Sequence, residues 1–264
     1  MFSPQIYPIG KCLGYISLGV RDLEAATEDA EHVLGLRRVH SEGGRRCFSS
    51  NDRQVELVLS SATRPALLAV GLEAANEDSF DLLKTRLSKA NVKFFEERDV
   101  YPGVAHLIRF FLPSGHPVEL HSSAGETNQS FYPTSGVRPR RLGHALLKVN
   151  DIPDVEAFLT EILSFRVSDR GVGVMKLTLT ETELDGVSAS PFSTRCGDWS
   201  ICDWNQPFPA LSGSAVRKFN MPSSHDLVSH AAVRIRADML FGIKVIGESG
   251  IDLACLVECF YLFR

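Results

Sequence analysis

The feature that most constrains this chain is an internal repeat. The segment LGYISLGVRDL begins at Leu13, and the related segment LGHALLKVNDI begins at Leu142, 129 residues later. The offset holds downstream without a gap, because residues 33–36 fall on residues 162–165. A repeat of this length predicts two similar folded units rather than one irregular core.

The opening of each copy has a clear local pattern. Apolar and polar residues alternate from Leu13 and from Leu142, which is typical of a strand. Asp22 and Asp151 then precede helical runs, where a carboxylate can accept hydrogen bonds from the first free amides. Each half is therefore predicted to open with a strand, an N-capped helix and a return strand.

A second strand-and-helix unit is predicted later in each half. In the first half the expected strands are 66–73, 106–111 and 117–121, and the expected helix is 79–91. In the second half, 210–219 is predicted as a strand and 224–237 as a helix.

Together these units predict an α+β fold of tandem βαβββ modules. The expected domains are residues 1–121 and 141–264, with the second one incomplete, and 122–140 is a linker rich in Gly, Ser, Thr and Pro. No GxGxxG motif is present, and the elements alternate too irregularly for a Rossmann sheet.

Composition excludes several classes of function. The net charge is −4, and the basic residues Arg138, Arg140 and Arg141 fall in the linker, so nucleic-acid binding is not expected. The six cysteines form no CxxC pair, which predicts reduced thiols and no zinc ribbon. We expect no signal peptide and no membrane span, and therefore a cytoplasmic protein.

The motifs around the repeat resemble a known family. LGYISLGVRDL, PSGHPVELHS and GVRPRRLGHALLKVNDI are similar to type I extradiol ring-cleavage dioxygenases of the 2,3-dihydroxybiphenyl 1,2-dioxygenase and catechol 2,3-dioxygenase type. These belong to the vicinal-oxygen-chelate (glyoxalase/bleomycin resistance/dioxygenase) superfamily. The resemblance covers residues 11–170 well and the rest patchily.

The resemblance implies a metal centre in the second domain. Family members hold Fe(II), and occasionally Mn(II), by two His and one Glu. This set occupies one face of an octahedron and leaves the other face open for a catecholic diol and O₂. The implied partners are thus a small aromatic diol and O₂, and the resemblance also allows a homo-oligomer.

Two of the implied ligands can be sought in the second half. The LGH motif places the first ligand at His144, whose repeat mate is Tyr15. The second ligand position falls on Gly213, which cannot bind a metal. His230 is the weaker candidate, because it lies inside the predicted helix 224–237.

The glutamate ligand belongs to a PxGxxxE turn in the family. The first half has this form ending at Glu119, but Tyr15 and Ala69 take the partner positions, so a structural or vestigial role is predicted. The same spacing counted from Gly213 ends at Phe263, so the glutamate is expected to be missing. Glu258 lacks the motif, and His225 stands in the wrong element for the usual proton-transfer histidine, so no catalytic residue is assigned.

The function implied by the resemblance is meta-cleavage of a catecholic or 2,3-dihydroxybiphenyl-type aromatic with O₂ at Fe(II). Because ligands are missing, this activity is predicted to be impaired. The alternative is a non-catalytic protein that binds small aromatics with the same fold, and a glyoxalase-like lyase or isomerase is a third hypothesis. Small frame errors or a decayed copy would account for the missing motifs.

Overall fold

The computed structural model describes residues 9–126, 132–134, 139, 141–171, 174–179, 198–203, 217–220, 229–235, 239–246 and 250–257. From residue 168 on, and at residues 143, 144, 146 and 148, the description covers the backbone. Gly213 and Glu258, considered above as metal-ligand positions, and His225, considered for proton transfer, lie outside the described residues.

The first half of the chain forms a mixed sheet of eight described strands in the order β2-β3-β4-β1-β5-β8-β7-β6. β4 runs parallel to β1, β5 runs antiparallel to β1, and β8 runs parallel to β5. The strands predicted at 66–73, 106–111 and 117–121 are confirmed as β5, β7 and β8. The bounds are β1 Gly10–Val20, β2 Arg37–Glu42, β3 Arg45–Ser49, β4 Leu57–Ser61, β5 Ala66–Ala74, β6 Phe94–Tyr101, β7 Val104–Phe111 and β8 Pro117–His121.

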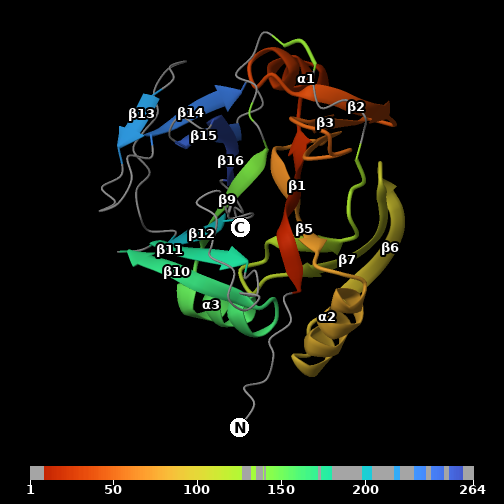
Figure 1. Cartoon of the computed structure of the whole chain (residues 1–264), viewed down its shortest axis with the longest axis vertical. Helices are drawn as coiled ribbons and strands as arrows, with labels where there is room; N and C mark the ends of the chain where they lie inside the picture. The colour runs from red at the N-terminus through yellow and green to blue at the C-terminus, as the bar shows by residue number, and fades with distance from the viewer. Residues whose placement is uncertain are drawn as a thin grey trace, which may run out of the picture.

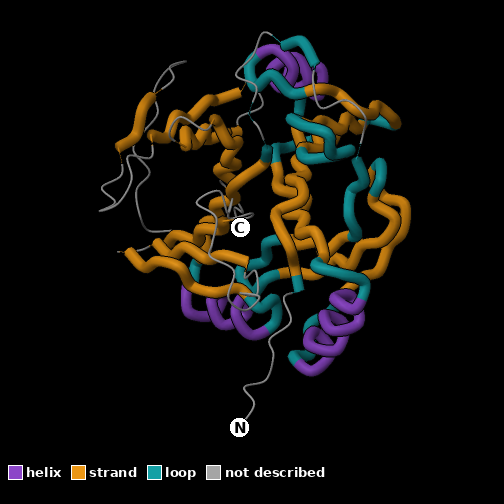
Figure 2. Tube along the Cα trace, in the orientation of Figure 1, coloured by secondary structure: helices purple, strands orange, loops and turns teal. Residues whose placement is uncertain are grey.

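Both predicted N-caps are confirmed. Helix α1 (Leu23–His32) begins after Asp22, whose carboxylate accepts from the Ala25 amide at 3.0 Å. Helix α3 (Ile152–Glu161) begins after Asp151, which accepts from the Asp154 amide at 3.0 Å. Helix α2 (Asp78–Lys89) confirms the helix predicted at 79–91 and buries Phe80, Leu83 and Leu87. The helices lie at the outside of the molecule, with the strands between them (Figure 2).

The second half forms another sheet of eight described strands, in the order β10-β11-β12-β9-β16-β15-β14-β13. In Figure 1 its green-to-blue strands lie to the left of the red-to-yellow strands of the first sheet, with β9 next to β1. β12 runs parallel to β9, as β4 does to β1, so the opening unit repeats the first. The bounds are β9 Leu142–Val149, β10 Phe165–Gly171, β11 Val174–Leu179, β12 Asp198–Asp203, β13 Arg217–Asn220, β14 Ser229–Ile235, β15 Met239–Ile246 and β16 Gly250–Val257.

The last part of the second sheet departs from the repeat. The helix predicted at 224–237 is wrong over Ser229–Ile235, which forms β14 and pairs with β13 and β15. Its polar residues His230 and Arg234 alternate with Ala231, Val233 and Ile235, a two-residue period that favours a strand. The repeat predicts a helix in this segment, but the segment follows its local two-residue pattern.

The strand beside β9 also differs from its counterpart in the first sheet. β16 fills the place beside β9, but it runs parallel to β9, whereas β5 runs antiparallel to β1. Over the described ranges the second sheet thus has as many strands as the first. In the described ranges the two sheets thus differ in the direction of the strand at this place.

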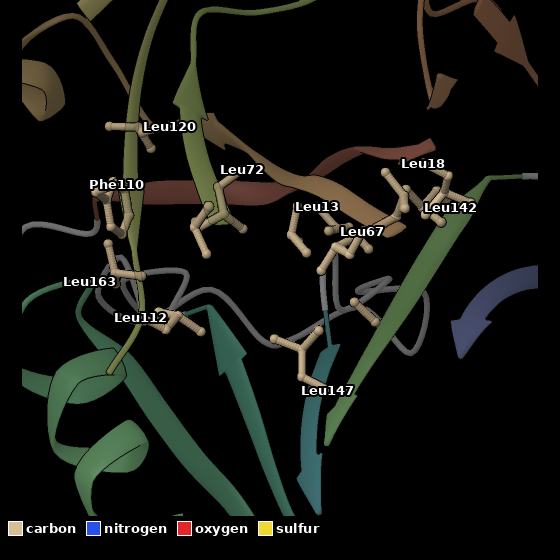
Figure 3. Close-up of a cluster of buried hydrophobic side chains, with 14 of the residues drawn as sticks. Leu13, Leu18, Leu67, Leu72, Phe110, Leu112, Leu120, Leu142, Leu147 and Leu163 are labelled. Carbon is tan, nitrogen blue, oxygen red and sulfur yellow. The ribbon is translucent and has the colours of Figure 1, made fainter. Parts of the chain in front are cut away.

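One apolar core joins the two units. Leu142, Leu147 and Leu163 of the second unit are buried in the same cluster as Leu13 and Phe110 of the first (Figure 3). Each Å² of apolar surface buried in this shared core stabilises the fold by about 25 cal/mol. The two sheets therefore stabilise each other.

Across the part of the chain that the structure describes, no helix is long and apolar enough to cross a membrane. The longest described helix, α2, has 12 residues.

Candidate functional site

His144 lies in the middle of β9, between β12 and β16. Its register neighbours are Asp198 on β12 and Ala254 on β16. Ala254 pairs in turn with Gly242 on β15. The next two positions across the sheet from His144, on β16 and β15, therefore hold residues whose side chains cannot bind a metal.

His230 is not a neighbour of His144. It lies on β14, paired with Phe219 and Lys244, and β16 and β15 separate its strand from β9. Three strand spacings correspond to about 14 Å along a sheet. The structure therefore does not bring the two predicted histidines to adjacent positions.

Asp198 is the residue that sequence reasoning missed beside His144. It is the first residue of β12. Parallel pairing of β12 with β9 makes Asp198 and His144 direct register partners. The repeat could have indicated a parallel strand beside β9, because β4 pairs in parallel with β1 in the first unit.

The corresponding place in the first unit is a row of four residues on adjacent strands. Tyr15 on β1 pairs with Gly71 on β5, Gly71 with Glu119 on β8, and Glu119 with Arg109 on β7. The Tyr15 hydroxyl donates to one carboxylate oxygen of the completely buried Glu119. The Arg109 Nε donates to the other at 2.6 Å, and Nη2 lies against the same oxygen.

Burial sets the electrostatics of this row. Burial raises the pKa of Glu119, and the bonds from Tyr15 and the charge of Arg109 oppose that rise in part. Burial and the nearby Glu119 carboxylate hold the pKa of Tyr15 well above its usual range. Tyr15 therefore stays a phenol and donates, and both Glu119 oxygens are engaged within the protein. This supports the structural role predicted for Glu119.

Close packing fills the space around this row. A Cβ on Gly71 would lie 2.7 Å from the Tyr15 Cζ, so the tyrosine ring crosses the strand where no side chain stands. Tyr15 and Tyr101 meet edge to face with ring centroids 4.9 Å apart. Ala124, from the segment after β8, is buried in the same cluster. We call this cluster, with Tyr15, Tyr101, Leu107 and Ala124, the inner cluster.

An open hollow lies at the rim of the first sheet. Its volume is about 510 Å³, and the β2–β3 and β6–β7 hairpins line it with His40, Glu42, Arg45 and Asp99. Arg45 Nη1 donates to the Val100 carbonyl at 2.9 Å, so the two ends of the sheet approach each other there. The lining is charged and of mixed sign, and none of it comes from β9.

The first unit matches a family model. Residues 13–120 match the Glyoxalase/Bleomycin resistance protein/Dioxygenase superfamily. The first unit is therefore similar to the domains of this superfamily. The match ends at Leu120 on β8 and so includes the whole row from Tyr15 to Glu119.

Curated relatives are extradiol dioxygenases at low identity. Metapyrocatechase of Pseudomonas sp. (strain CF600) is 25% identical over 175 residues, which cover 60% of this chain and 56% of that protein. Biphenyl-2,3-diol 1,2-dioxygenase of Paraburkholderia xenovorans (strain LB400) is 26% identical over 168 residues, covering 60% and 56%. The matched region thus spans little more than half the length of these relatives.

Solved structures share the fold over nearly the whole chain. Homoprotocatechuate 2,3-dioxygenase from Arthrobacter globiformis has a TM-score of 0.70 at 15% identity, covering 97% of this chain and 87% of that chain. The 2,3-dioxygenase LapB from Pseudomonas sp. KL28 has a TM-score of 0.64 at 16% identity, with 94% and 92% covered. A Mn(II)-bound glyoxalase from Novosphingobium aromaticivorans scores 0.64 at 19% identity, with 95% and 83% covered.

The described residues do not assemble a metal centre. Within the described ranges, no group of three or more His, Cys, Asp or Glu side chains could hold a metal ion. At the register positions beside His144, Asp198 alone carries a carboxylate, and Ala254 and Gly242 carry no donor. Neither register neighbour of His144 is therefore a histidine or a glutamate.

Proposed function

We propose that this chain is an extradiol-dioxygenase-type protein whose ring-cleaving activity is impaired. The supporting observation is that the curated relatives and most of the structural neighbours named above are extradiol dioxygenases. The proposed substrates are a catecholic or 2,3-dihydroxybiphenyl-type diol and O₂. A cytoplasmic location and a homo-oligomer belong to the same proposal.

The proposed metal is Fe(II), with Mn(II) as the second choice, and His144 is its proposed first ligand. His230 is a weaker candidate, because β16 and β15 separate its strand from β9. Metal affinity comes from several ligands on one preformed face, so one imidazole alone binds Fe(II) poorly. We therefore expect weak binding and slow or absent turnover.

Metal content and product formation test this proposal together. The protein is reconstituted with Fe(II) without oxygen, its iron per chain is measured, and 2,3-dihydroxybiphenyl and catechol are then supplied with air. We expect substoichiometric iron and a slow yellow ring-fission product that His144→Ala abolishes. His40→Ala, at an exposed histidine of the first unit, is the matched control.

Two results would contradict the proposal. Stoichiometric iron with fast turnover would show that the ligand set is complete and that the activity is not impaired. No product with either diol, combined with thermal stabilisation by the diol without metal, would favour the non-catalytic binding protein instead.

A further inference from the structure

Glu56 is a buried carboxylate that no part of the proposed chemistry uses. It directly precedes β4 and is 2% exposed. A buried carboxylate is costly unless hydrogen bonds or a cation compensate its charge. The hydrogen-bond donors around the Glu56 carboxylate therefore show which parts of the fold it holds together.

Hydrogen-bond donors reach both oxygens of Glu56. Oε2 accepts from the Ser50 amide and the Ser50 hydroxyl, each at 2.6 Å, and from the Ser49 hydroxyl at 3.4 Å. Oε1 accepts from Asn51 Nδ2 at 3.0 Å and from the Leu142 amide at 3.0 Å. Four of these donors come from the last residue of β3 and the turn after it, and the fifth comes from the second unit.

Leu142 is the first residue of β9, two residues before His144. Its side chain is buried beside Leu18 and Leu67 of the first unit (Figure 3). The start of β9 is therefore fixed twice, by an apolar contact and by a charged acceptor. Of these two contacts, only the hydrogen bond to the Glu56 carboxylate fixes the orientation of the β9 backbone. A hydrogen bond depends on the alignment of its atoms, and an apolar contact does not.

The segment that leads to β9 is attached to the same turn. The Tyr132 hydroxyl lies 2.9 Å from the Gly35 carbonyl and 3.4 Å from the carbonyls of Ser49 and Ser50. The Gln54 amide donates to the Gly125 carbonyl at 3.3 Å. The turn at 49–56 thus contacts the chain at three successive points before and at the start of β9.

We propose that Glu56 is a positioning residue, whose carboxylate fixes the start of β9 and with it the backbone of His144. The role of His144 as a ligand rests on the proposed function above. The positioning itself needs no metal, because every contact that carries it is made within the chain.

Amide hydrogen exchange of the full chain tests this role. In Glu56→Gln an NH₂ group replaces one acceptor oxygen, so either the Ser50 or the Leu142 amide faces a donor. Since hydrogen bonds to charged groups are among the stronger ones, we expect exchange at 142–149 to accelerate about tenfold or more. Glu73→Gln is the matched control, because Glu73 is also buried but bonds Arg53 and Cys12 within the first unit.

The comparison is made at urea concentrations that give the two variants equal global stability. Faster exchange in β9 for Glu56→Gln alone supports the positioning role, and equal exchange in both variants overturns it. If Glu56→Gln does not fold, Glu56→Asp decides, because it keeps the charge but shortens the reach to Leu142. Exchange in β9 that matches the wild type in Glu56→Asp overturns the proposal as well.

Metal binding separates this inference from the proposed function. If the wild type binds Fe(II), its Kd should weaken about tenfold in Glu56→Gln and remain unchanged in Glu73→Gln. If the wild type binds no Fe(II), the proposed function fails, while the exchange result still decides the role of Glu56.

Discussion

The imidazole of His121 is completely buried against the Tyr15 ring of the inner cluster, with ring centroids 4.6 Å apart. Its Nδ1 lies 2.6 Å from the Ser122 carbonyl oxygen, and its Nε2 has no hydrogen-bond partner among the described residues. Burial disfavours the charged ring and lowers the pKa of His121 from 6.5 to about 4. The fold therefore holds the neutral form.

This shift makes the stability of the first unit depend on pH. Because the folded-state pKa lies below the unfolded one, the unfolded chain binds the proton more readily. The difference corresponds to about 3 kcal/mol of unfolding free energy, present above pH 6.5 and lost as the pH falls toward 4. The buried His116, whose pKa burial also lowers to about 4, adds a similar amount. Together they are comparable to the whole stability of a typical domain.

Urea unfolding from about pH 7.5 to about pH 4.5 measures this effect. His121→Asn keeps a donor near the Nδ1 position and does not titrate, so it should lose about 2.5 kcal/mol less than the wild type over that range. His40→Asn, at an exposed histidine, should follow the wild type. Equal losses of unfolding free energy in the wild type and His121→Asn would refute the reasoning.

Three further predictions concern the row across the first sheet, each checked by urea unfolding near neutral pH. Tyr15→Phe removes a donor from the buried Glu119 and should cost about 1–3 kcal/mol; an unchanged midpoint would contradict the bond. Arg109→Met leaves that carboxylate without its cation and should cost about 3–5 kcal/mol, and adding Glu119→Gln should recover part of the loss. Gly71→Ala places a methyl group against the Tyr15 ring and should cost about 1–3 kcal/mol, whereas the wild-type midpoint would show that the ring yields freely.

Much of the first unit could be predicted because local pattern and repeat agree there. The strands expected from Leu13 and at 117–121, and the carboxylates of Asp22 and Asp151 as N-caps, are local signals that agree with the fold, although β1 and β8 are buried almost throughout rather than on alternate residues. The two sources of information disagree at β14. There the repeat called for a helix, and the two-residue period of the segment itself was the better guide.

The site was less predictable, because it depends on contacts between distant residues. The repeat pointed to Tyr15 and Glu119 as partner positions, but their bond also requires Gly71 to have no side chain. Glu56 stands before an apolar strand and would be taken for a solvent-exposed residue in the sequence. Its partner at Leu142 lies 86 residues away, and no local signal links the two.

The parallel pairing of β9 with β16 has a consequence for synthesis of the chain. The first sheet can close once residue 121 has left the ribosome, because all of its strands precede that point. β9 must wait for residues 250–257, since its neighbour on that side is translated last among the described strands. Until then β9 presents an unpaired edge, which is where nascent chains associate wrongly. Docking of β9 onto the finished first unit would shelter that edge during the delay.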